Sequence, residues 1–260
     1  MIYLCAAPKE LSSARQSFSR IAHAACHIDT NGHLHSTLSA PCNKDDLLLL
    51  TAEEQSPFHE PAALCRSIKE ILLKSGLKGA AADFPPPVTA EKLRFLSLLS
   101  RELTASGISF FAPEEFASNL PAATAVICTA MSGGIFTTRL EEAISRFGNG
   151  HIALDIQRLT MLFPIPSPTG VGTHLSHTEF KNLFLSLQPA VFFSRELCAK
   201  YFLLRQQGQL HLVLFDDIST LLEKLRIGKR MGISHFFFSY PEISDILGAL
   251  SLAINKEKTL

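Results

Sequence analysis

Short apolar runs alternate along the chain with longer segments in which apolar residues recur at helical spacing. The runs cover residues 2–7, 21–28, 47–52, 79–84, 108–112, 125–130, 151–156 and 235–240. Runs of this length that are apolar throughout are typical of parallel strands buried on both faces. The segments 60–76, 89–107, 136–150 and 218–232 each carry one broad apolar face, which indicates amphipathic helices. The pattern predicts strands and helices in alternation.

Eight strand–helix units within 260 residues match the size of a (β/α)8 barrel. We therefore predict an α/β fold with a single TIM-barrel domain over residues 1–260. A doubly wound open sheet is the alternative, but no glycine-rich fingerprint for a nucleotide follows the first strand. Two hairpins are predicted as insertions, one at Asn31-Gly32 after strand 2 and one at Gln207-Gly208 before strand 8. The Pro- and Gly-rich segment 161–177 is long enough to be a loop over the active face.

Composition excludes several classes of function. Lys plus Arg equals Asp plus Glu, at 24 each, so no basic surface for nucleic acid is expected. The six cysteines are scattered and no histidine pair lies near Cys or acids at ligand spacing, so we expect reduced thiols, no metal and no cofactor. The start lacks the core of a signal peptide and no apolar run could cross a bilayer. We predict a soluble cytoplasmic protein with no membrane partner, and leave its oligomeric state open.

The stretch "GAAADFPPP", residues 79–87, brings a single carboxylate, Asp83, to the end of a small apolar strand. In a (β/α)8 barrel the ends of the strands form the face that carries function. An acid after a strand often caps the next helix instead. That interpretation fits Asp83 less well because three prolines follow it.

The segments 20–35, 46–54, 78–87 and 194–240 resemble family 18 glycoside hydrolases, in particular the bacterial spore-germination and cortex-lytic branch. The first resembles a strand followed by a D-x-x-G-x-L hairpin, and the last contains "FDD" followed by Ser219 and then a final apolar strand. The resemblance implies a glycoside-hydrolase-like barrel. It also implies that an N-acetylated oligosaccharide or muropeptide is the partner, inside the cell or enclosed in a spore.

The family's catalytic motif, D-G-x-D-x-D-x-E, is degenerate in this chain. In the family the Glu protonates the leaving oxygen, and the preceding Asp orients the N-acetyl group that acts as nucleophile. Position by position, the four acids correspond to Lys78, Ala81, Asp83 and Pro85. Proline has no proton to donate, and loss of a general acid typically lowers the rate about 10²–10⁴-fold. The resemblance therefore implies a non-catalytic or catalytically altered protein.

The remaining polar groups at the strand ends are candidates for the site. The catalytic candidates are Asp83, Asp155, Glu114 and Glu115. The ligand-binding candidates are Asp83, Phe84, Ser132, Asp155, Gln157, Arg158 and Tyr240.

Three functions stay open at this point. They are a lectin-like glycan-binding protein, a hydrolase with a relocated carboxylate (Glu114 or Glu115 with Asp83 or Asp155), and a protein-interaction barrel with a vestigial pocket. An open cleft with convergent acids and an exposed ring would favour the first two. A pocket filled by Phe side chains, or an exposed apolar patch outside the pocket, would favour the third.

Overall fold

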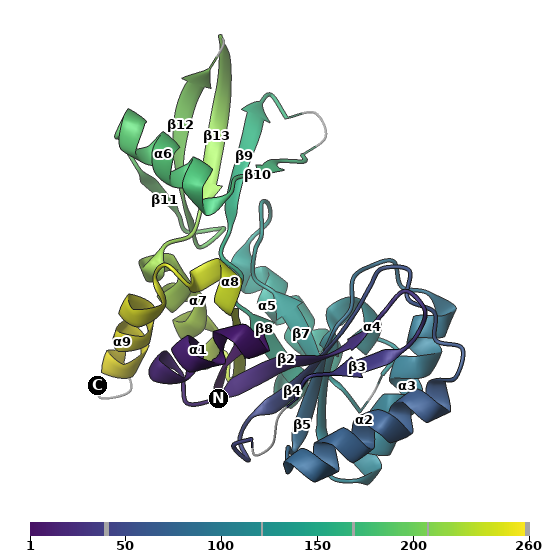
Figure 1. Ribbon diagram of the computed structural model, residues 1–260. Helices are drawn as coiled ribbons and strands as arrows, with labels where there is room; N and C mark the ends of the chain where they lie inside the picture. Colours follow the sequence, from purple (N-terminus) through teal and green to yellow (C-terminus); the bar gives the residue numbers. More distant parts are fainter. Residues whose placement is uncertain (39–41, 121, 168–169, 207, 258–260) are drawn as a thin grey trace.

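Figure 1 shows the computed structural model of the chain, which describes residues 1–257 apart from 39–41, 121, 168–169 and 207. Eight parallel strands pair in the order β1-β14-β8-β7-β6-β5-β4-β2, and β1 pairs with β2 to close a barrel. They are β1 (Ile2–Ala6), β2 (Ile21–Ile28), β4 (Leu47–Ala52), β5 (Gly79–Asp83), β6 (Ser109–Pro113), β7 (Thr124–Cys128), β8 (Ile152–Asp155) and β14 (His235–Ser239). Each coincides with a predicted run, and the (β/α)8 prediction is confirmed.

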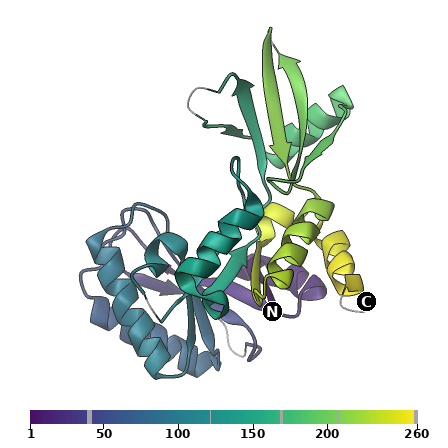
Figure 2. The same cartoon turned by 180° about the vertical axis from the view of Figure 1, so that it is seen from behind.

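Helices follow the barrel strands, and the longer ones cover the outside of the barrel (Figures 1 and 2). The helices are η1 (Pro8–Glu10), α1 (Leu11–Ser17), α2 (Pro61–Ser75), α3 (Ala90–Ala105), α4 (Glu114–Ala117), α5 (Phe136–Phe147), η2 (Asn149–His151), α7 (Ile218–Arg230), α8 (Tyr240–Ile243) and α9 (Leu247–Glu257). Of these, η1, α4 and α8 lie at the mouth of the barrel. Thr89 caps α3, because its hydroxyl accepts the N–H of Lys92 at 3.2 Å. Between β2 and β4 the described residues form no helix but a hairpin strand, β3 (Leu34–Ser36), paired antiparallel with β2.

A second, antiparallel sheet is inserted between β8 and α7 and stands away from the barrel (Figure 1). Its order is β10-β9-β13-β12-β11. Its elements are β9 (Thr160–Ile165), β10 (Thr173–His174), α6 (His177–Leu187), β11 (Phe192–Ser194), β12 (Ala199–Gln206) and β13 (Gln209–Phe215). The insertion is therefore larger than the predicted hairpin, which corresponds to β12 and β13; Gln207 lies outside the described residues.

The segment 161–177, expected as a loop over the active face, contributes β9 and β10 to this sheet instead. The prolines of this segment were the reason for expecting a loop. Pro168 and Thr169 lie outside the described residues. Pro164 is compatible with a strand because β10 pairs only with Met161 and Leu162. One side of β9 is thus an edge at Pro164, where the missing N–H costs no ladder hydrogen bond.

The inside of the barrel is filled by side chains from alternate strand positions. This inner cluster consists of Tyr3, Ala22, Leu47, Leu49, Ala81, Phe111, Ala153 and Phe237. On the outside, Gly228 allows α7 to lie close to the strands, since a Cβ there would meet Leu154 at 2.7 Å and Phe236 at 2.8 Å. The packed interior leaves the ends of the strands as the place for a ligand. Among the described residues, no helix is both long and apolar enough to span a membrane.

Candidate functional site

A cavity of about 600 Å³ opens at the C-terminal ends of the barrel strands. Asp83, Glu114, Glu115, Asp155 and Gln157 all border it, so the structure brings these sequence candidates together. This face carries the active site in (β/α)8 enzymes. The cavity is open rather than filled by Phe side chains, as expected of a ligand cleft, but the two rings of its lining, Phe84 and Phe237, are 2% and 4% exposed and do not supply the expected exposed ring.

Asp83 is the last residue of β5 and borders the cavity, where its side chain is still open to solvent. The surrounding walls of the cavity partly desolvate the carboxyl and raise its pKa. The next side chain turns to the other face of the strand, as alternation requires. The ring of Phe84 is 2% exposed and stacks on Phe58 and Phe95 at 5.6 and 6.1 Å. Phe84 therefore borders the cavity from the outer core and offers no exposed ring to a sugar.

A buried lysine fastens the proline loop that follows Asp83. Lys92, on α3, is 1% exposed and donates from Nζ to the carbonyls of Pro85 at 2.7 Å and Pro87 at 3.3 Å. A hydrogen bond from a charged donor is stronger than a neutral one. The loop bordering the cavity is thereby held against α3, and this role of Lys92 was not expected from the sequence.

Asp155 is the last residue of β8 and borders the cavity. Gln157 donates from Nε2 to Asp155 Oδ2 at 2.7 Å, and Cys128 donates from Sγ to Gln157 Oε1 at 3.2 Å. Burial raises the pKa of Asp155 to about 7; the bond from Gln157 opposes the rise, and the charges of Glu242 and Asp83 add to it. Near neutral pH Asp155 is therefore present in both protonation states and can donate or accept a hydrogen bond.

Glu242, in α8, is a further acid at this cavity, and it was not predicted from the sequence. Burial raises the pKa of its carboxyl, although the N–H of Arg158 donates to Oε2 at 2.9 Å. Arg158 donates from its guanidinium to the carbonyl of Glu242 at 3.3 Å and to Asp245 at 2.7 Å. Arg158 thus connects α8 to the segment that follows β8. Its side chain does not line the cavity. The only sequence clue to Glu242 is its place just after the last strand.

Glu114 and Glu115 open α4 directly after β6, as a strand-end position predicts. Glu114 is paired with Arg139 and with Arg146, the latter at 3.6 Å, and both arginines belong to α5. The ion pairs of this carboxylate hold α5 against the edge of the cavity. Glu115 is exposed on the rim.

Two other predicted binding residues lie outside the cavity lining. Ser132 is exposed in the bend between β7 and α5. Tyr240 packs on the barrel's outer hydrophobic cluster. Two cysteines not predicted for the site, Cys5 and Cys128, do border the cavity. Both occupy the ends of barrel strands, so the strand-end rule could have found them.

The two thiols of the cavity are poor nucleophiles. Burial, followed by the charge of Asp155, raises the pKa of Cys5 well above its usual value. Burial likewise raises the pKa of Cys128 to about 11. Because the thiolate is the reactive form, both side chains act as neutral thiols. No group of three His, Cys, Asp or Glu in the described part of the chain could hold a metal ion.

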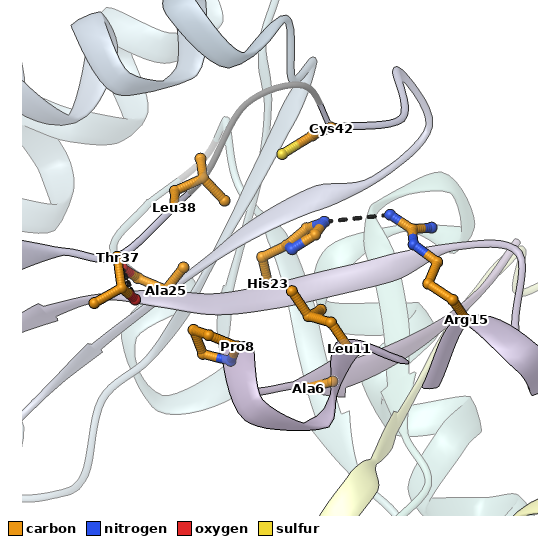
Figure 3. Close-up of a pocket in the computed structure, with 9 residues that line it drawn as sticks. All are labelled: Ala6, Pro8, Leu11, Arg15, His23, Ala25, Thr37, Leu38 and Cys42. Atoms are coloured by element: carbon orange, nitrogen blue, oxygen red, sulfur yellow. Dashed lines mark hydrogen bonds between the residues drawn. The ribbon is translucent and has the colours of Figure 1, made fainter. Parts of the chain in front are cut away.

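A smaller cavity of about 150 Å³ lies on the outer side of β2, beside the segment between β2 and β4 whose described residues form no helix (Figure 3). His23 and Arg15 border it, and both bond the buried carboxylate of Asp46, His23 at 2.9 Å. Burial alone would raise the pKa of Asp46, but the bonds from His23, Arg15 and the N–H of Ile21 lower it to about 2. The cluster fixes the connection into β4, and none of the predicted site residues lies there.

Solved structures share this fold. A chitinase from Chromobacterium violaceum matches with a TM-score of 0.67 at 14% identity, over 97% of this chain and 98% of that one. The spore cortex-lytic enzyme SleL of Bacillus megaterium matches with 0.61 at 14% identity, over 95% and 72%. A family 18 chitinase of Cycas revoluta in complex with (GlcNAc)4 matches with 0.64 at 12% identity, over 96% and 98%. No family model and no curated protein matches the chain. The chain thus has the fold of family 18 chitinases and spore cortex-lytic enzymes.

Proposed function

We propose that the cavity at the barrel mouth binds an N-acetylated glycan, such as an N-acetylglucosamine oligomer or a peptidoglycan fragment, without the family 18 hydrolytic mechanism. The observation that carries the proposal is the open cavity of about 600 Å³ bordered by Asp83, Asp155 and Gln157. Carboxylates and an amide in a concave site are the groups that bind sugar hydroxyls and acetamido N–H groups.

The absence of a family-type acid supports binding without cleavage. Pro85 stands where the resemblance places the general acid, and its carbonyl is fastened to Lys92 at 2.7 Å. Of the motif's acids only Asp83 remains, in the place of the residue that orients the acetamido group. An orienting group without a proton donor can bind the sugar but cannot assist departure of the leaving oxygen.

A relocated carboxylate is the second candidate function, and one observation favours it. Burial raises the pKa of Asp155 to about 7, the range suited to a general acid. Asp155, with Asp83 as partner, would then be the acid. Glu114 is less suited because Arg139 and Arg146 engage its carboxylate.

The test is calorimetric titration of (GlcNAc)4 into the full chain, with the same solutions analysed by mass spectrometry. We expect binding without shorter products, and binding at least about tenfold weaker in Asp83→Asn. Glu70→Gln, on exposed α2, is the matched control and should bind as the wild type does. Cleavage that Asp155→Asn abolishes would replace the proposal with the hydrolase. Absence of binding by (GlcNAc)4 and by a muropeptide would leave the barrel without a glycan function.

A further inference from the structure

Six large apolar side chains are exposed within residues 185–203 of the inserted sheet, each over 38–62% of its surface. They are Leu185, Leu187, Val191, Phe192, Phe193 and Leu203, which we call the β11 patch. They occupy the last turn of α6, the residue before β11, the strand β11 and the middle of β12. Phe192 and Leu203 lie on the face of the sheet away from α6 and Phe193 lies on the α6 face, so the patch wraps around the β11 edge. Exposed apolar side chains in such a number mark interaction surfaces on soluble proteins.

The two rings of β11 point to opposite faces of the sheet. Phe192 lies opposite Tyr201, with ring centroids 5.5 Å apart. Phe193 lies opposite Lys200, which pairs in turn with Phe215 on the face covered by α6. A sugar-binding platform needs rings on one face. Rings on both sides of an edge strand fit a partner that docks along that edge.

The outer edge of β11 is open. It is the last strand of the sheet order, so no described strand pairs with its outer side. Natural edge strands are usually protected by charged side chains. Here residues 182–194 carry no charge at all. The neighbouring Lys200 is compensated by Asp217 at 2.5 Å.

We propose that this edge joins two copies of the chain. A strand can pair antiparallel with its own copy across a two-fold axis, which brings the same patch of both copies together. Pairing of β11 with β11 would place the Phe193 rings of the two copies beside each other and meet no like charge. Five strands from each copy would then form one continuous sheet, with both α6 helices on the same face.

The size of the patch indicates a reversible dimer. Because the six side chains lie on both faces of the sheet, pairing along the β11 edge covers only part of them, less than the roughly 1,000 Å² of a stable specific interface. Association should therefore depend on concentration in the micromolar range. The inserted sheet stands away from the barrel in both views, so the proposal is independent of glycan binding at the mouth (Figures 1 and 2).

Sedimentation velocity of the full chain from about 1 to 200 µM tests the proposal. We expect the wild type to shift from monomer to dimer over this range. Phe193→Lys should weaken association more than about tenfold, because two like charges would face each other across the axis. Leu185→Lys, at a more exposed site, serves as a second variant that folding defects would not affect. Leu252→Lys, which is 66% exposed on α9, is the matched control and should associate like the wild type.

Two results would overturn the proposal. One is a wild type that stays monomeric over the whole range; the other is a dimer that persists in both Phe193→Lys and Leu185→Lys. Titration of (GlcNAc)4 into Phe192→Lys tests the other interpretation, that this face of the inserted sheet binds glycan. Loss of sugar binding in that variant, with a monomeric wild type, would assign the face to glycan instead.

Discussion

Asp216 and Lys224 form an ion pair whose two side chains have no exposure to solvent. Lys224 Nζ donates to Asp216 Oδ2 at 2.6 Å, and the N–H of Leu159 donates to the same oxygen at 3.0 Å. The N–H of Asp216 donates in return to the carbonyl of Leu159 at 2.8 Å. Leu159 leads from the barrel into β9, and Asp216 leads from β13 back to α7. The pair therefore joins the two chain crossings between the barrel and the inserted sheet.

Breaking this pair from one side should be costly. Lys224→Met leaves a buried carboxylate without its counter-charge, and Asp216→Leu leaves a buried ammonium in the same position. Each should lower the free energy of unfolding by about 3–5 kcal/mol, a large part of the ~5–15 kcal/mol that stabilises a typical domain. The double variant Asp216→Leu with Lys224→Met removes both charges and leaves mainly the Leu159 N–H unpartnered, at about 1–3 kcal/mol.

Urea unfolding at pH 7, followed by far-ultraviolet circular dichroism, gives the three free energies. We expect the double variant to be several kcal/mol more stable than the sum of the single effects predicts. Lys229→Met, an exposed lysine in the last turn of the same helix, is the control and should change stability by less than ~0.5 kcal/mol. Single variants costing under ~1 kcal/mol, or strictly additive effects, would refute the assignment of a buried ion pair.

Three further changes follow from the structure. Lys92→Met should accelerate amide exchange at Phe84 and Val88, because the carbonyls of Pro85 and Pro87 lose their donor. Unchanged exchange would contradict the role of Lys92 in holding this loop. Asp155, whose pKa rises from 3.8 to about 7, binds a proton on folding, so stability should fall as pH rises through that interval. Asp155→Asn should flatten this dependence in thermal unfolding from pH 3 to 8; an equal slope would argue against the raised pKa. Gly228→Ala should destabilise by about 1–3 kcal/mol in chemical unfolding, whereas Gly248→Ala, with open space around it, should not.

The barrel could be predicted from the sequence because its strands are buried on both faces. Such strands appear as continuous apolar runs, and their number and spacing limit the possible folds. The inserted sheet was harder to predict. Its strand β9 contains Pro164, and prolines are typical of loops, yet the short β10 leaves this position unpaired on one side.

The sequence predicts those site residues that lie at the ends of strands. It does not predict those whose position depends on contacts between segments distant in the sequence. Asp83, Asp155 and Gln157 follow from the rule that function lies at the C-terminal ends of the strands. Arg158 is close in sequence but points to Asp245, which lies 87 residues away along the chain. Lys92 is on the helix after the loop it holds, and no pattern of residues distinguishes a buried lysine from an exposed one.

Diffraction from crystals soaked with (GlcNAc)4 shows whether this cavity binds glycan. We expect intact sugar at the barrel mouth, with polar atoms within hydrogen-bond distance of Asp83 and of Asp155 or Gln157. Crystals of Asp83→Asn treated in the same way should show weaker density or none. Sugar bound only elsewhere, or a mouth that stays free of sugar while the cavity is accessible in the lattice, would contradict the claim that this cavity binds glycan.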